Sequence, residues 1–65
     1  MKFFLIKEIP KDLEKIFFPL GIYPGKNILV KKKIPFTNTT IIEVDKITYA
    51  ISNSLFFKLK LDEKD

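Results

Sequence analysis

The feature that most restricts the fold of this chain is a ten-residue stretch, FFPLGIYPGK, at positions 17–26. It contains both glycines of the 65-residue chain and two of its four prolines. Gly21 stands where a helix would end, and glycine enters the left-handed region there without steric cost. Pro24 and Gly25 suit the central positions of a type II turn, in which proline presets the first φ and glycine accepts a positive second φ. The stretch therefore predicts a corner that ends a helix and starts a strand.

Short apolar segments on both sides of the corner predict one helix and several strands. Residues 2–8 form an apolar run of strand length. Between positions 9 and 20 the apolar residues recur on one helical face, and Pro19 should stop the helix near Phe18; the apolar set is Ile9, Leu13, Ile16, Phe17 and Leu20. After the corner, apolar and polar residues alternate, which predicts strands at 26–33, 40–45, 46–52 and 57–61.

Two of the later connections are expected to be tight. Asp45 and Lys46 would form the tip of a hairpin, although the glycine that favours such tips is missing. Asn53 and Ser54 would cap a single helical turn at residues 55–56.

These elements predict a mainly β fold. We expect a small SH3-like barrel of about five antiparallel strands, with one short helix between the first two strands. The barrel would span residues 1–61 as a single domain, and residues 62–65 would be a charged tail. The chain has no cysteine and no histidine, so apolar side chains alone must stabilise this domain.

The composition argues against catalysis and against a metal site. Without histidine or cysteine the chain lacks the commonest general base, thiol nucleophile and zinc ligands. Glu43 and Asp45 share a strand face and acidic residues crowd positions 62–65, but such carboxylates are expected to be solvated. We therefore expect no enzymatic activity, no metal ligands and no cofactor.

The start of the chain predicts no targeting segment. The apolar run after Lys2 ends at Lys7, which is too short for a signal peptide or a membrane span. We expect a cytoplasmic protein without direct membrane insertion.

The order of several short motifs resembles the ferrous iron transport protein A (FeoA) family. The helix ends in Leu-Gly-Ile-Tyr-Pro-Gly at 20–25, where that family has Leu-Gly-Ile-x-Pro-Gly. A lysine-rich strand and a Pro-Phe pair at 35–36 follow. Residues 49–51, Tyr-Ala-Ile, match an Ile-Ala-Leu-like strand, and 59–61, Leu-Lys-Leu, match a final Ile-x-Val-like strand. The chain resembles a divergent or N-terminally shortened member, because it begins at about the family's first strand.

The resemblance implies a fold, a partner and a role. FeoA-like proteins have an SH3-like barrel and act as accessory proteins of ferrous iron uptake. Their partner is the cytosolic part of a large membrane GTPase permease of the FeoB type. The family as a whole is described under transition metal ion binding. For this chain the resemblance implies a non-catalytic protein that modulates the permease by contact.

Several large apolar side chains fall outside the expected core faces, namely Phe18, Leu29, Phe36, Ile41 and Phe56. Exposed apolar clusters mark contact surfaces, for a partner or for self-association. The alternative is that a very small barrel buries both faces of its strands at the ends. The candidate partner-binding residues are Phe18, Ile22, Tyr23, Lys31, Lys33 and Phe36.

Single-stranded nucleic acid is the alternative partner. Lysines at 31–33 form a basic run, and small barrels bind single strands through basic grooves and exposed aromatic residues. However, the net charge of +4 comes from lysine alone, and arginine, the preferred residue for phosphate and base contacts, is absent. Three lysines in a strand also protect a sheet edge from aggregation. We therefore expect nucleic acid to be a less favoured partner than a protein.

Overall fold

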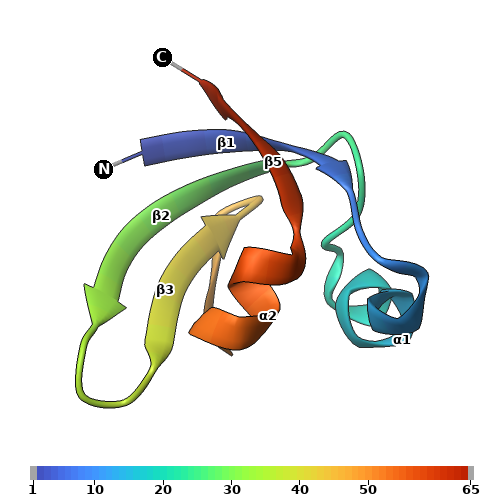
Figure 1. Ribbon diagram of the computed structural model, residues 1–65. Helices are drawn as coiled ribbons and strands as arrows, with labels where there is room; N and C mark the ends of the chain where they lie inside the picture. Colours follow the sequence, from blue (N-terminus) through green and yellow to red (C-terminus); the bar gives the residue numbers. More distant parts are fainter. Residues whose placement is uncertain (1, 65) are drawn as a thin grey trace.

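The fold is a bent five-stranded sheet with helical segments packed against one face (Figure 1). The computed structural model describes residues 2–64. The antiparallel strands lie in the order β4-β3-β2-β1-β5. They are β1 (Lys2–Glu8), β2 (Asn27–Ile34), β3 (Thr39–Val44), β4 (Ile47–Ser52) and β5 (Lys60–Lys64). Between β1 and β2 lie the 3-10 turn η1 (Lys11–Leu13), α1 (Glu14–Phe17) and the 3-10 turn η2 (Phe18–Leu20), while α2 (Asn53–Lys58) joins β4 to β5.

The predicted fold class is confirmed: the protein is mainly β, with five antiparallel strands and a short helix between the first two. The sheet differs from the expected barrel in one respect, because β4 and β5 remain its two edges and do not pair within residues 2–64. The connection between these edges is the helix α2 rather than a tight turn. Phe56 of this helix is buried in the core. The helix therefore occupies the space between the two edge strands, and the bent sheet stays open there.

The helix α2 is longer than the single turn expected at 55–56. Its N-cap is Ser52, whose hydroxyl accepts a hydrogen bond from the Leu55 N–H at 3.2 Å. Asn53, the expected cap, instead lies in the first turn and accepts a hydrogen bond from the hydroxyl of Thr40. Because the helix continues to Lys58, Phe57 is exposed on it and does not begin the last strand as expected.

The last strand therefore begins and ends later than predicted. β5 pairs with β1, with Asp62 opposite Leu5 and Lys64 opposite Phe3. Residues 62–64 were expected to be a tail, but they form the second half of this strand, with exposed side chains. Position 65 of the expected tail lies outside the described residues.

Fewer apolar residues of the helical stretch between β1 and β2 are buried than the sequence predicted. Leu13 and Phe17 are buried, as is Ile9 just before the stretch, whereas Ile16 and Leu20 are each 41% exposed. Only the residues four apart therefore point into the core. Pro19 ends the α-helix as expected, and the chain continues as one 3-10 turn to Gly21.

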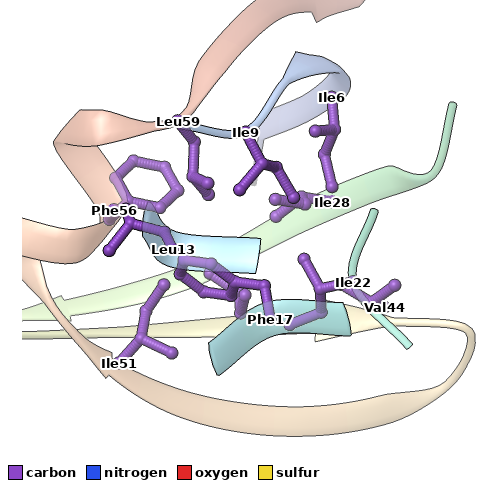
Figure 2. Close-up of a cluster of buried hydrophobic side chains, with 11 residues drawn as sticks. Ile6, Ile9, Leu13, Phe17, Ile22, Ile28, Val44, Ile51, Phe56 and Leu59 are labelled. Carbon is purple, nitrogen blue, oxygen red and sulfur yellow. The ribbon is translucent and has the colours of Figure 1, made fainter. Parts of the chain in front are cut away.

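One cluster of apolar side chains fills the space between the sheet and the helical segments (Figure 2). Phe17 lies within it at 0% exposure, beside Leu13 and Ile22. The cluster consists of Ile6, Ile9, Leu13, Phe17, Ile22, Ile28, Ile42, Val44, Ile51, Phe56 and Leu59. Thr40 is the one buried polar residue within 2–64, and its bond to Asn53 satisfies it.

Replacing Phe17 by alanine should remove a large part of the stability. Phe→Ala in a core costs about 3–5 kcal/mol, and a chain of this length is expected to have roughly 3–10 kcal/mol in total. Urea unfolding followed by circular dichroism measures the effect. Phe36→Ala is the matched control, since Phe36 is 97% exposed, and its free energy of unfolding should change by less than about 0.5 kcal/mol. Equal losses in both variants would contradict this description of the core.

Candidate functional site

The glycine-proline corner has the backbone geometry that the sequence predicted. Gly21 is left-handed at φ 81° and caps η2. Gly25 has φ 95°, and the Lys26 N–H donates to the Tyr23 carbonyl at 3.1 Å, as expected for a turn with Pro24 and Gly25 in its centre. A Cβ on either glycine would meet no atom within 4 Å. The positive φ alone is therefore what requires glycine at these positions.

This corner presents two aromatic side chains to solvent. Phe18 and Tyr23 are each 43% exposed and pack edge to face, with ring centroids 6.4 Å apart and planes at 85°. We call this pair the aromatic corner. Ile22, predicted as a partner-binding residue beside them, is fully buried in the core. Ile22 is therefore not part of the exposed surface, and of these two neighbours only Tyr23 reaches solvent.

Main-chain hydrogen bonds attach the corner to the first strand. The Gly25 N–H donates to the Ile6 carbonyl, and the Ile6 N–H donates to the Lys26 carbonyl, both at 2.9 Å. The corner therefore continues the pairing of β1 with β2. Its backbone is fixed by the sheet and does not depend on side chains alone.

Side chains of the β3–β4 hairpin also form hydrogen bonds to the corner. The hydroxyl of Tyr49 donates to the Leu20 carbonyl at 2.5 Å. The Lys26 ammonium donates to the carboxylate of Asp45 at 2.5 Å and lies 5.0 Å from the centre of the Tyr23 ring. The hydrogen bond to Asp45, followed by the interaction with Tyr23, raises the pKa of Lys26 above its ordinary value. The aromatic corner is thus pre-organised.

A second surface feature is a shallow groove at the opposite end of β2. Its volume is about 280 Å³, and it is lined by Lys2, Phe4, Val30, Lys31, Lys32, Lys33 and Phe56. The Lys33 ammonium lies 6.0 Å from the ring centre of Phe56 and 5.3 Å from that of Phe57. We call this the basic groove. It combines an apolar floor with ammonium groups, so an anionic ligand with a flat apolar part would fit it.

The structure separates the predicted partner-binding residues into distinct places. Phe18 and Tyr23 form the aromatic corner, whereas Lys33 belongs to the basic groove. Lys31 also lines that groove, and its ammonium pairs with Glu43 at 3.4 Å. Phe36, 97% exposed, lies in the turn between β2 and β3, far along β2 from the corner (Figure 1).

The other three large apolar residues expected outside the core, Leu29, Ile41 and Phe56, are partly or fully buried. Phe56 is buried on α2, and Leu29 and Ile41 on the strands are half-buried, so the small sheet buries part of both faces.

Within residues 2–64 no three carboxylates come close enough together to hold a metal ion. No helix in the same part of the chain is long and apolar enough to cross a membrane.

Sequence reasoning missed the contacts that fix the corner. Lys26 and Asp45 are nineteen positions apart, and Tyr49 and Leu20 twenty-nine. Nothing in their local sequence indicates these pairs, because they depend on how the β3–β4 hairpin crosses the helical segments. Phe57 was missed for a local reason, since its alternation with Leu59 and Leu61 imitated a strand.

Comparison of the chain with models of known protein families and with curated proteins found no match in either. The FeoA resemblance therefore remains a prediction that depends on the motifs themselves.

The Lys26–Asp45 pair gives a prediction that can be checked directly. Asp45→Asn removes the bond that raises the pKa of Lys26, so this pKa should fall toward the ordinary lysine value of 10.5. An NMR titration that follows the Lys26 Cε signal in the unchanged protein and in Asp45→Asn measures it. Because the folded-state pKa is raised, the pair stabilises the fold below the unfolded pKa and loses this effect as pH rises through the folded value. An unchanged Lys26 pKa would show that Asp45 does not control it.

Proposed function

We propose that this protein is a non-catalytic binding module that acts by protein contact through the aromatic corner. The observation that supports this most is the exposure of Phe18 and Tyr23 on a backbone fixed by β1. Aromatic side chains dominate the energetics of protein interfaces, and pre-organised ones lose little conformational entropy on binding. A corner required only to turn the chain would need the two glycines but not two exposed rings.

The resemblance to the FeoA family suggests the partner. Tyr23 of the aromatic corner lies within the Leu-Gly-Ile-Tyr-Pro-Gly segment at 20–25, one of the matching motifs, and Phe18 lies two residues before that segment. We therefore propose a cytoplasmic accessory protein of ferrous iron uptake that contacts the cytosolic part of a FeoB-type permease. We propose no metal site in this chain, although the family is described under transition metal ion binding, because the chain has no imidazole or thiolate ligand.

Phe18→Asp should weaken binding of the permease's cytosolic domain at least about tenfold, since a charge at an interface centre is poorly tolerated. Isothermal titration with the purified domain measures the change. Phe57→Asp is the matched control, because Phe57 is exposed on α2 and lies outside the corner. Circular dichroism must show both variants folded. Equal binding by Phe18→Asp and the unchanged protein would contradict the proposed surface, and unfolding of Phe18→Asp would show that Phe18 supports the core.

The basic groove favours single-stranded nucleic acid as a second candidate. Lys33 lies beside two phenylalanine rings, of which Phe57 is 68% exposed and available to stack on a base. A titration with a labelled oligonucleotide at several salt concentrations tests it. Tight binding that falls steeply with salt, and that is lost in Lys33→Gln but kept in Phe18→Asp, would favour this candidate over the first.

A further inference from the structure

The two edges of the sheet are built very differently. β5 has the sequence KLDEK, with four charged residues among five, and such charges prevent an edge from pairing with another chain. β4 has the sequence ITYAIS, with no charge, proline or glycine. It is six residues long and consists largely of residues with high strand propensity. One edge is therefore protected against pairing and the other is not.

The main chain of β4 has unused hydrogen-bonding groups. Asp45 and Lys46 form a two-residue hairpin tip with φ values of 52° and 68°, as a type I′ turn requires. In such a hairpin the residues beside the tip, Val44 and Ile47, exchange both main-chain bonds, and every second pair does the same. The N–H and C=O of Thr48 and Ala50 therefore point away from β3. Among residues 2–64, no hydrogen bond outside the strand ladders uses these groups.

We propose that two copies of this chain pair through β4 in antiparallel fashion, about a two-fold axis, to make one continuous sheet. Centred on Tyr49, this pairing places Thr48 opposite Ala50 of the second copy, where the two residues exchange both main-chain bonds. It also places Ile47 opposite the second copy's Ile51. The inference is independent of the aromatic corner and goes beyond the proposed function.

A second copy can pair with this edge without charge repulsion, and β4 is complementary to itself about Tyr49. The chain carries a net charge of +4, so two copies repel each other as a whole, but β4 itself contains no charged residue and brings no like charges together. Ile47, 55% exposed at this edge, would become buried by the added strand. Because β5 is protected by charge, the two-fold pairing closes at two copies and does not extend into a fibre.

Sedimentation equilibrium of the whole chain at several concentrations tests the proposal. The unchanged protein should show the mass of two chains, dissociating on dilution. The variant Thr48→Lys/Ala50→Lys places lysines opposite each other and should show the mass of one chain at every concentration. Thr37→Lys/Ser54→Lys is the matched control, with the same added charge at exposed positions off this edge, and it should associate like the unchanged protein. Phe18→Asp should also leave the dimer mass unaltered.

Amide hydrogen exchange on the unchanged protein gives a test that requires no variant to fold. The amides of Thr48 and Ala50 should be protected at high protein concentration and should exchange at least about tenfold faster after dilution into the monomer range. A single-chain mass at millimolar concentration would overturn the proposal. So would fast exchange of these two amides in the associated state, or a dimer that persists in folded Thr48→Lys/Ala50→Lys.

Discussion

The burial of Phe17 against one face of the bent sheet is the interaction on which the rest of this structure depends. The chain has no disulfide and no histidine or cysteine for a structural metal, so packing must supply its stability. Phe17 is fully buried, and the other residues of its cluster come from β1, the helical stretch, β2, β3, β4 and α2. A sheet of five short strands is held in its bent form because both helical segments insert side chains into the same cluster.

The same packing determines which side chains reach the surface at the corner. Phe17 and Phe18 are neighbours in sequence, and so are Ile22 and Tyr23, yet in each pair the first is buried and the second is exposed. Gly21 allows the chain to reverse between these pairs. The buried members fix the exposed members in position, so the core and the candidate contact surface are formed by one local segment. A substitution at Gly21 would disturb both at once.

The parts of the fold that could be predicted from sequence are those with local physical causes. The positive φ at Gly21 and Gly25, the stop at Pro19 and the hairpin tip at Asp45-Lys46 follow from the chemistry of single residues and their neighbours. The end of the chain could not be predicted in this way. Alternation from Phe57 to Leu61 suited a strand, but the helix cap at Ser52 and the burial of Phe56 favour helix through Lys58. The cap at Ser52 is a local contact, but the burial of Phe56 depends on tertiary packing that the sequence does not show.

The candidate site shows the same division. Phe18 and Tyr23 were among the candidate partner-binding residues and are exposed, whereas Ile22 of the same set is buried by tertiary packing that the sequence does not show. The contacts of Lys26 with Asp45 and of Tyr49 with Leu20 join segments far apart in sequence. These contacts convert a flexible turn into a fixed aromatic surface, and only the three-dimensional structure reveals them.

NMR chemical-shift mapping tests most directly whether the aromatic corner is a protein-contact surface. The isotope-labelled chain would be titrated with the cytosolic domain of a FeoB-type permease, and the perturbed amides assigned. The account predicts that the largest changes fall on residues 18–26 and on the Asp45 tip that supports them. Changes confined to the basic groove around Lys33 and Phe57, with the corner unaffected, would contradict it.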